Sequence, residues 1–397
     1  MSPAADQVLV LNSGSSSIKF ALFGIDRDRP AARPALSGRA TGIGTPSGRL
    51  VFDDEAPTPL APAASHPHHA AMDAIRAGLD TRLDPRRLRL VAHRVVHGGD
   101  RFRVPVAVDR AVLATLRRLV PLAPLHQPFA LDAIERWLDG RPGLPQVACF
   151  DTAFHHTLAR VEQQLPLPRE MWARGLRRYG FHGLSYAWQA HVLPERHGEL
   201  ARQRVLVAHL GSGASLCALH GLRSVATTMG FSALDGLMMG TRCGSLDPGA
   251  LLYLMQIEGL DLAQVGDLLY NRSGLLGVSG RSADPRDLLA VEDEDEDARL
   301  ALALFVRRVV REAGALVAVL GGLDLLVFTA GIGEHSAPLR ARICAGLSFL
   351  GIAIDAAANA GNARVISAPG SRVRVAIEPA DEEWIAARDA LAALTAG

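Results

Sequence analysis

Short apolar runs that end in small or polar residues recur along this chain. Residues 8–11 are strand-favouring residues that lead into the Ser- and Gly-rich turn 12–17, and a second apolar run leaves that turn. The same order returns at residues 205–210, which lead into the turn 211–215. Apolar runs of this length bounded by Gly and Ser predict buried strands joined by tight turns. Because the pattern occurs twice, it predicts two related α/β halves.

Other strands and helices are predicted from the same kind of pattern. Strands are expected at 88–93, 146–150, 325–329, 364–366 and 373–377, with short irregular strands in 24–65 and a Gly turn at 331–334. Helices are expected near 69–79, 109–119, 128–139, 247–258, 261–270, 298–320 and 381–394. Several strands end at a polar residue, which is where α/β proteins place their chemistry.

Length and composition narrow the class of protein. A chain of 397 residues is too long for one ordinary core, so two domains are expected. Hydrophobic residues make up 49% and the net charge is +1, which is typical of a globular protein and predicts no nucleic-acid or membrane partner. The four cysteines form no CxxC pair and are expected as free thiols. Residues 1–6 lack the basic-then-apolar order of a signal peptide, so we expect a cytoplasmic protein.

Two further stretches have an ordinary interpretation. The apolar stretch 313–333 contains Asp324 and two adjacent glycines, so it predicts a helix, a turn and a buried strand rather than a membrane span. The acidic run 292–297 precedes a predicted helix, whose N-terminus favours negative charge. A solvated loop is therefore predicted there in preference to a metal site.

The first turn carries the clearest candidate chemistry. Lys19 is the only lysine, since the other 41 of the 42 basic residues are arginine. An ammonium beside a Ser- and Gly-rich turn is a flexible point charge for phosphate, and Asn12 offers an oxygen suited to Mg²⁺. The alternative is an ordinary hairpin with a chance lysine. No GxxxxGK[ST] or GxGxxG motif occurs, which argues against P-loop and Rossmann proteins.

Four other candidates lie in loops or at strand ends. Arg94 and Arg242 are flanked by apolar residues or glycine and can form paired hydrogen bonds with carboxylate or phosphate. Asp151 and His182 are candidates for a base and an electrostatic stabiliser. The alternatives are surface arginines, a capping aspartate and a hydrogen-bonded core histidine. No metal-ligand spacing such as HExxH occurs.

Nine ordered segments together resemble the acetate kinase family, of the acetate and sugar kinase/Hsp70/actin superfamily. They are NSGSSSIKF at 12–20, HRVVHGG at 93–99, APLHQP at 123–128, FDTAFH at 150–155, RRYGFHGLS at 177–185, HLGSGAS at 209–215, MGTRCG at 239–244, TAGIGEHS at 329–336 and ADEEW at 380–384. The resemblance implies two duplicated RNase H-like (actin-like ATPase) domains of α/β class, with mixed sheets flanked by helices and a cleft between them. The domains expected are 1–150, completed by a helix at 383–397, and 151–382. A homodimer that binds acetate and ATP is also implied.

The resemblance assigns roles position by position. Asp151, His182 and Arg242 correspond to catalytic residues. Arg94 corresponds to the arginine that binds the substrate carboxylate, and the acyl pocket would be lined by Val96, Leu125, Phe181 and Ala233. Asn12 and Glu382 correspond to the residues that hold Mg²⁺, with Mn²⁺ as an alternative. The nucleotide-binding positions are Lys19, His209, Leu210, Gly211, Ser212, Gly213, Asp284, Pro285, Arg286, Gly331, Ile332, Gly333, Glu334 and His335.

Five positions depart from the family pattern. Ser212, His335 and Gln127 each stand where the family has Asn, and Ser245 stands where it has Asp. Ala233 replaces a proline of the acyl pocket. These departures leave the preferred nucleotide base and the size of the acid open.

The reaction implied is direct in-line transfer of the γ-phosphoryl group of ATP to acetate, which gives acetyl phosphate and ADP. A carboxylic acid is already ionised at pH 7, so Asp151 is expected to orient an arginine or a metal-bound water rather than to remove a proton. Alternatives are a propionate or butyrate kinase of the same family, a sugar kinase, and a nucleotide-binding regulator without transfer. The six candidates retained as a set argue against the regulator: Asn12, Arg94, Asp151, His182, Arg242 and Glu382.

Overall fold

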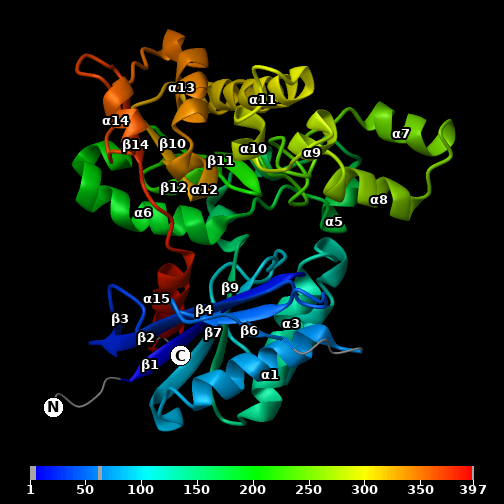
Figure 1. Cartoon of the computed structure of the whole chain (residues 1–397), viewed down its shortest axis with the longest axis vertical. Helices are drawn as coiled ribbons and strands as arrows, with labels where there is room; N and C mark the ends of the chain where they lie inside the picture. Colours follow the sequence, from blue (N-terminus) through cyan, green and yellow to red (C-terminus); the bar gives the residue numbers. More distant parts are fainter. Residues whose placement is uncertain (1–5, 61–64, 396–397) are drawn as a thin grey trace. The chain divides into compact units, whose positions relative to one another are not determined.

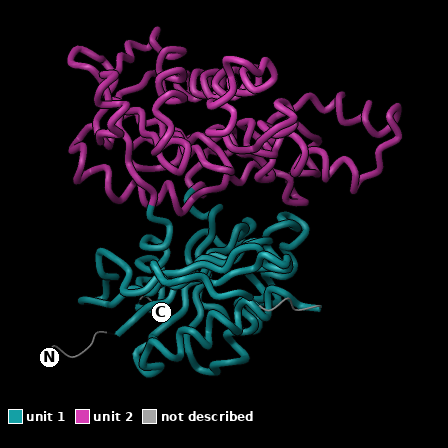
Figure 2. Tube along the Cα trace, viewed as in Figure 1, with its two compact units in different colours: residues 1–154, 381–397 teal, residues 155–380 magenta. Residues whose placement is uncertain are grey.

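The computed structural model describes residues 6–60 and 65–395. It contains two compact units (Figures 1 and 2): unit 1 is residues 1–154 and 381–397, and unit 2 is residues 155–380. The chain thus leaves unit 1 after residue 154 and returns to it after residue 380, where the sequence predicts domain limits after 150 and 382. Residues 1–5, which bear on the expectation about a signal peptide, lie outside the described residues.

Unit 1 is built on one mixed sheet with the strand order β6-β5-β4-β2-β1-β7-β9-β8, and β3 pairs with β2. Its strands are β1 Gln7–Ser13, β2 Ser17–Asp26, β3 Arg29–Pro30, β4 Leu36–Thr41, β5 Arg49–Phe52, β6 Thr58–Pro59, β7 Leu88–Val95, β8 Val106–Ala107 and β9 Gln146–Phe150. Its helices are α1 Pro67–Asp80, α2 Arg110–Arg117, α3 Gln127–Gly140 and α15 Glu382–Thr395.

The core of unit 1 follows from alternation along the strands. Leu9 and Leu11 of β1 pack in one apolar cluster with Ile75 of α1 and Trp137 of α3. The intervening residues of β1 point to the opposite face of the sheet, because successive side chains of a strand alternate. Helix α15 packs there, since it contacts β1, β7 and β9, and Figure 1 shows it across the sheet from α1. The C-terminal helix therefore covers the second face.

Unit 2 is built on a five-stranded mixed sheet with the order β12-β11-β10-β13-β14. Its strands are β10 Val205–Leu210, β11 Ala214–His220, β12 Arg223–Thr227, β13 Leu325–Thr329 and β14 Arg374–Ile377. Its helices are α4 Arg160–Gln163, α5 Arg169–Ala173, α6 Gly183–His197, α7 Pro248–Gln256, α8 Leu262–Asn271, α9 Gly274–Ser279, α10 Pro285–Leu289, α11 Glu296–Leu320, α12 Ala330–His335, α13 Ala337–Gly346 and α14 Ala356–Ala360. The sheet lies between α6 and α11 (Figure 1).

The two sheets share a five-stranded core, which confirms the predicted duplication. In unit 1 the order is β4-β2-β1-β7-β9, and in unit 2 it is β12-β11-β10-β13-β14. In each, the first three strands pair antiparallel and the last two join in parallel. The turns β1–β2 and β10–β11 therefore occupy equivalent places in the two cores.

The two ends of α11 account for the acidic run 292–297 and for the apolar stretch 313–333. Asp295 caps α11 by accepting a hydrogen bond from the Ala298 amide, and Glu296 and Asp297 lie in the first turn, so the end of the acidic run stabilises a helix N-terminus. Gly321 ends the same helix at φ 71°, a left-handed conformation that glycine adopts readily. In the part of the chain that the structure describes, no helix is long and apolar enough to span a membrane.

Three local predictions are wrong or incomplete. Residues 364–366 form no strand, because Val365 makes only an isolated bridge to Ala376. The predicted turn 331–334 is part of α12, where the Glu334 carboxylate accepts from the Ala330 amide at 2.7 Å and closes the first turn. The sequence analysis also missed α6, which contains Pro194 and residues that are buried on several sides, so no simple helical stripe marks it.

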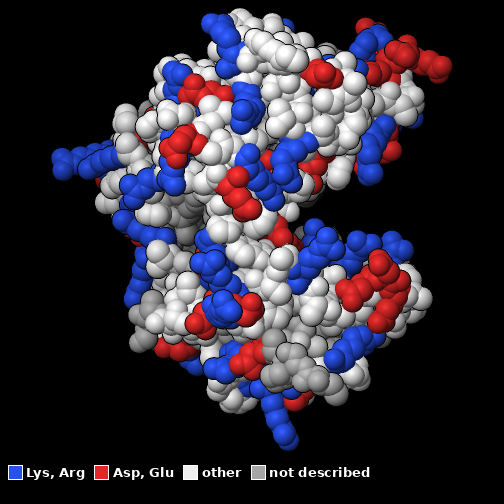
Figure 3. All heavy atoms as spheres, turned by 90° about the vertical axis from the view of Figure 1, so that its left-hand side faces the viewer, with Lys and Arg blue, Asp and Glu red and all other residues white. Residues whose placement is uncertain are grey.

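Charged side chains of both signs are intermingled on the face drawn in Figure 3. Arginines commonly pair with carboxylates, as in Arg342–Glu292 at 2.6 Å and Arg204–Asp324 at 2.7 Å. These pairs account for part of the high arginine content as ordinary structural charge.

Candidate functional site

The predicted site residues fall into two groups, one in each unit. The first lies at the ends of the central strands of unit 1. Asn12 near the end of β1 is paired across the hairpin with Lys19 of β2. The turn that joins them is closed by a hydrogen bond from the Gly14 amide to the Ser17 carbonyl at 2.8 Å. The hairpin therefore places the candidate metal ligand and the single lysine opposite each other.

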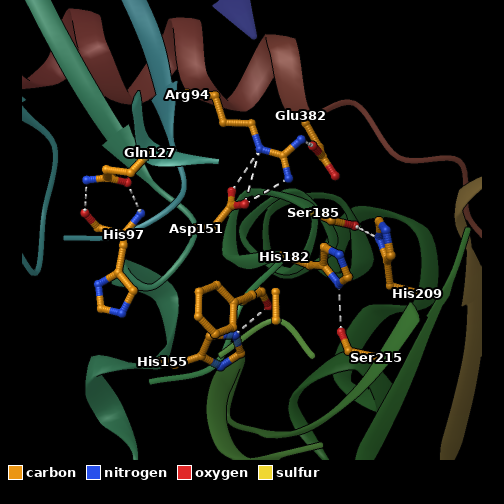
Figure 4. A network of polar contacts seen from close by, with 12 residues as sticks. Arg94, His97, Gln127, Asp151, His155, His182, Ser185, His209, Ser215 and Glu382 are labelled. Carbon is orange, nitrogen blue, oxygen red and sulfur yellow. Dashed lines mark hydrogen bonds and ion pairs between the residues drawn. The ribbon is translucent and has the colours of Figure 1, made fainter. Parts of the chain in front are cut away.

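Arg94 and Asp151 come together because their strands are parallel neighbours. Arg94 of β7 pairs with Cys149 of β9, and Asp151 follows directly after β9. Arg94 donates from Nε to Asp151 Oδ1 at 3.0 Å and from Nη2 to Oδ2 at 2.8 Å (Figure 4). Its Nη1 lies 2.8 Å from Glu382 Oε2, on the first residue of α15. Both carboxylates thus contact one guanidinium, and the orienting role of Asp151 stays a prediction.

The charge balance at Arg94 keeps it cationic. Burial by itself would lower the pKa of Arg94, but Asp151 and Glu382 outweigh it and raise the pKa above its usual value. A guanidinium has five N–H groups. The contacts to the two carboxylates use one N–H group each of Nε, Nη1 and Nη2. The second N–H groups of Nη1 and Nη2 can therefore donate to an anion.

Lys19 lines a separate cavity of about 410 Å³ in unit 1, together with Arg39, Asp53, Asp381 and Glu383. The pKa of Glu383 is raised, first by burial and second by the neighbouring Glu382, while Lys19 and Arg94 oppose the rise. The lone lysine therefore lies near a carboxylate that follows β5 and carboxylates at the start of α15.

The first two acyl-pocket candidates lie near a hydrogen-bonded loop. Val96 is half-buried and Leu125 is exposed. The fully buried Gln127 carboxamide accepts from the His97 amide at 3.1 Å and donates to the His97 carbonyl at 2.9 Å (Figure 4). Burial lowers the pKa of His97 to about 4, and its neutral Nδ1 accepts from the Gly99 amide. The departure at Gln127 therefore fixes the backbone next to Val96.

In unit 2, three predicted loops line one cavity of about 550 Å³. This volume is in the range of small-molecule sites. The predicted lining residues that it contains are Gly211, Ser212, Asp284, Pro285, Arg286, Gly331, Ile332 and His335. Five other predicted positions of these unit 2 segments do not line it: His209, Leu210, Gly213, Gly333 and Glu334. Four lining residues were missed by the sequence analysis, namely Ala283, Leu289, Ser336 and Pro338.

His182 and Arg242 meet at the turn between β10 and β11. A Cβ placed on Gly213 would lie 3.2 Å from His182 Nε2 and 3.8 Å from Arg242 Nη1, so both nitrogens lie close to this glycine. Burial lowers the pKa of Arg242, although a guanidinium remains charged in proteins. Arg242 Nη1 also donates to the Ala233 carbonyl at 3.1 Å, which links the departure at 233 to the catalytic candidate.

The backbone of His182 is in a left-handed conformation, with φ 57°, at the residue that precedes α6. Such a φ is uncommon for a residue other than glycine and is often stored at functional sites. The His182 ring stacks on His209 at 4.2 Å between centroids, and its Nδ1 lies 2.8 Å from Ser215 Oγ (Figure 4). His209 in turn contacts Ser185 Oγ at 2.9 Å. Ser185 and Ser215 end the segments 177–185 and 209–215, but the sequence analysis gave neither serine a role.

The backbone of Phe181, the third acyl-pocket candidate, is hydrogen-bonded to the side chain of His155. The Nε2 of His155 donates to the Phe181 carbonyl at 2.9 Å, and Ser224 Oγ lies 2.9 Å from Nδ1. Burial lowers the pKa of His155 to about 4, so the imidazole is neutral. The sequence analysis did not single out His155, although it ends the FDTAFH segment.

The chemistry of the donors fits a Mg²⁺ carried by phosphate groups. Asn12 and Glu382 are oxygen donors of unit 1, and within the described residues no three His, Cys, Asp or Glu side chains are placed to hold a metal. Mg²⁺ prefers oxygen ligands, keeps several waters and is commonly held by one or two protein carboxylates plus substrate phosphates. A site with few protein ligands is therefore compatible with this ion.

Comparisons with known proteins agree with the motifs. The model of the acetokinase family matches residues 7–388. An acetate kinase of Rhodopseudomonas palustris is 49% identical over 391 residues, which cover 97% of each chain. A solved propionate kinase from Francisella tularensis is 32% identical with a TM-score of 0.90, covering 97% of this chain and 98% of the other. A solved acetate kinase from Porphyromonas gingivalis is 34% identical with a TM-score of 0.86, covering 98% and 100%.

Proposed function

The chain belongs to the acetokinase family, and on this premise we propose that it is an acetate kinase, which transfers the γ-phosphoryl group of ATP to acetate. The observation that carries the proposal is the cavity of unit 2, which is lined by Gly211 and Ser212 of the turn after β10, by the start of α10 and by α12, the helix that follows β13. A Gly- and Ser-containing turn such as 211–213 presents backbone N–H groups to phosphates without obstruction by large side chains. The cavity supports nucleotide binding in unit 2.

Arg94 is proposed to orient the acid. Its two remaining N–H groups suit the two oxygens of a carboxylate, and Asp151 and Glu382 prevent the guanidinium from rotating. Because acetate is ionised at pH 7, it attacks without a base. Asp151 therefore acts on Arg94 rather than on a proton of the substrate.

Arg242 and His182 are proposed to stabilise the phosphoryl group during transfer. Phosphoryl transfer depends on positioning and on charge stabilisation rather than on covalent chemistry of the protein. Both nitrogens that surround Gly213 can donate to equatorial oxygens. Lys19 supplies a further point charge for phosphate.

Asn12 and Glu382 are proposed to hold Mg²⁺, or Mn²⁺ as an alternative. The metal would neutralise charge on the nucleotide phosphates and help to align them. Both residues belong to unit 1, on β1 and α15.

A hydroxamate assay with ATP, Mg²⁺ and acetate tests the proposal directly. The protein should form acetyl hydroxamate, and Arg242→Ala should abolish most of it. Nucleotide binding in calorimetry without any acyl phosphate would instead favour the regulator, and the kinase proposal would be wrong.

A propionate kinase is the second candidate, favoured by one residue. Ala233 replaces the proline of the family pattern, and its carbonyl is held by Arg242. The smaller side chain leaves room for a longer acid. The ratio of kcat/KM for propionate and acetate separates the two candidates.

A homodimer is proposed through the exposed apolar surface of α7 and α8, a hairpin that projects from the rest of unit 2 in Figure 1. Helix α7 has no buried residue, and Leu252, Tyr253 and Leu262 are 56%, 54% and 78% exposed. Apolar surface of this kind typically marks an association site. Light scattering should give a dimer that Leu252→Asp shifts to monomer, and a monomeric parent protein would contradict this assignment.

The cytoplasmic location expected from the sequence stays a prediction. Cys149, Cys217, Cys243 and Cys344 are all free thiols, as in proteins of reducing compartments.

A further inference from the structure

Two buried hydroxyl groups connect the interior of unit 2 to His182. Tyr186 Oη lies 2.5 Å from Ser215 Oγ, and Ser215 Oγ lies 2.8 Å from His182 Nδ1. The side chains come from α6 and β11, and both Tyr186 and Ser215 are fully buried. Ser215 is therefore the shared partner of a phenol and an imidazole, and its single hydrogen can serve only one of them.

The chemistry of the two hydroxyls favours one direction. A phenol is a stronger acid than an aliphatic alcohol, so Tyr186 is the better donor to Ser215. Ser215 then donates its own hydrogen to His182 Nδ1. The ring nitrogen that accepts a hydrogen bond carries no proton, so in a neutral imidazole the proton resides on the other nitrogen.

The surroundings of His182 disfavour a second cation. Its Nε2 and the Arg242 guanidinium border the same glycine, Gly213, and the ring stacks on His209 at 4.2 Å. A neutral imidazole with its hydrogen on Nε2 can still donate to a phosphoryl oxygen. A neutral imidazole of the other tautomer would present a lone pair to that oxygen.

We infer that Tyr186 and Ser215 are positioning residues that keep the hydrogen of neutral His182 on Nε2, toward Gly213 and Arg242. This inference rests on the proposed function, in which His182 donates to the phosphoryl group. The first turn of α6 holds the arrangement together, because the Tyr186 amide donates to the His182 carbonyl at 3.1 Å. Backbone and side chain of Tyr186 thus constrain the same histidine.

The tautomer can be measured without catalysis. In the ligand-free, full-length protein with ¹⁵N-labelled histidine, the His182 signal is assigned by its loss in His182→Gln. We expect the hydrogen on Nε2 in the parent protein, and a mixture of both tautomers in Tyr186→Phe and Ser215→Ala. A hydrogen on Nδ1 in the parent, or an unchanged tautomer in both variants, would overturn the inference.

Steady-state kinetics tests whether the effect passes through His182. Tyr186→Phe should lower kcat about threefold or more, in proportion to the fraction of His182 that no longer carries its hydrogen on Nε2, while KM for ATP and for acetate changes less than about twofold. In a His182→Ala background the same change should cause no further loss. An equal loss in both backgrounds would mean that Tyr186 acts only on the structure.

Tyr179→Phe is the matched control. Its hydroxyl donates to the Gly175 carbonyl at 2.8 Å, so the variant also loses one tyrosine hydroxyl in unit 2. We expect kcat within about twofold of the parent. If the parent protein makes no acyl phosphate, the proposed function fails, whereas the tautomer measurement still decides the inference about Tyr186 and Ser215.

Discussion

The two units share a five-stranded core but use its equivalent turn differently. In unit 1 the β1–β2 hairpin carries Asn12 and Lys19, and the neighbouring strand ends carry Arg94 and Asp151. The candidate site residues of unit 1 are mostly charged, and Arg94 forms ion pairs with Asp151 and Glu382. The candidate chemistry of unit 1 therefore depends on side chains rather than on backbone groups.

In unit 2 the β10–β11 turn contributes mainly backbone. Gly211 and Ser212 line the larger cavity, and Gly213 leaves room for His182 and Arg242. The imidazoles nearby are held by serine hydroxyls rather than by carboxylates. The shared strand order places both turns, β1–β2 and β10–β11, at the same point of the sheet. The residues at each turn differ, and so does the chemistry that each turn offers to a ligand.

The largest expected effect distinguishes the two arginines. Arg94→Met and Arg242→Met should each lower kcat/KM at least about 100-fold, because each removes preorganised charge. Only Arg94→Met leaves two largely buried carboxylates without their cation, so the free energy of unfolding should fall by about 3 kcal/mol. Arg242→Met should change it by about 1 kcal/mol. Urea unfolding measures the difference, and equal losses of stability would refute it.

The second prediction concerns the neutral histidines behind the acyl-pocket candidates, His97 in unit 1 and His155 in unit 2. Burial lowers both pKa values from 6.5 to about 4, so the unfolded chain binds more protons between these pH values. Their contribution to stability is present above pH 6.5 and is lost as the pH falls to about 4. Each histidine should add a slope of up to about 1.4 kcal/mol per pH unit.

His97→Gln and His155→Gln test this slope in urea unfolding at pH 6.5, 5 and 4. Each variant should show a weaker dependence of the unfolding free energy on pH than the parent. The same dependence in parent and variant would mean that the histidine does not stay neutral in the folded state.

The third prediction compares the turns themselves. Lys19→Arg should lower kcat about tenfold although the charge is kept, because a planar guanidinium cannot replace a compact ammonium. Ser212→Asn, which restores the family residue, should leave KM for ATP within about threefold, since the unit 2 turn acts through backbone groups. Full activity of Lys19→Arg would show that turnover does not require an ammonium at position 19.

The smallest effect is expected at position 233. Ala233→Pro fixes φ and adds about two carbons of apolar wall, while it keeps the carbonyl that Arg242 contacts. A methylene in an apolar site is worth roughly 0.8 kcal/mol, so the propionate-to-acetate ratio of kcat/KM should fall several-fold. A ratio unchanged by proline would show that Ala233 does not limit the acid.

Much of the fold could be predicted from the apolar runs. β9 and β13 match the predicted strands, and α11 was expected within two residues of its observed start and at its observed end. The failures have local causes. Residues 364–366 have strand-like composition, but they make one bridge rather than a ladder. Strand formation depends on a partner that is distant in the chain, which composition does not reveal.

The candidate site was less accessible to sequence reasoning. The motifs point to Arg94, Asp151, His182 and Arg242, because these residue types stand beside glycine or at strand ends. The residues that position them give little signal. Ser215, Tyr186 and Gln127 are ordinary polar residues until the fold buries them against a histidine or a backbone amide. A buried polar group must find a partner, and that partner is known only from the structure.

From the sequence alone, hydrophobic periodicity and the positions of glycine predicted most of the strands of the two sheets and the residue types available for chemistry, because both signals act locally. Tertiary structure decided which of these residues contact one another. The Arg94–Asp151 pair joins residues on two parallel strands, and its contact with Glu382 depends on the C-terminal helix returning to unit 1. Such contacts are set by strand order and by helix packing, which are properties of the whole unit rather than of any short segment.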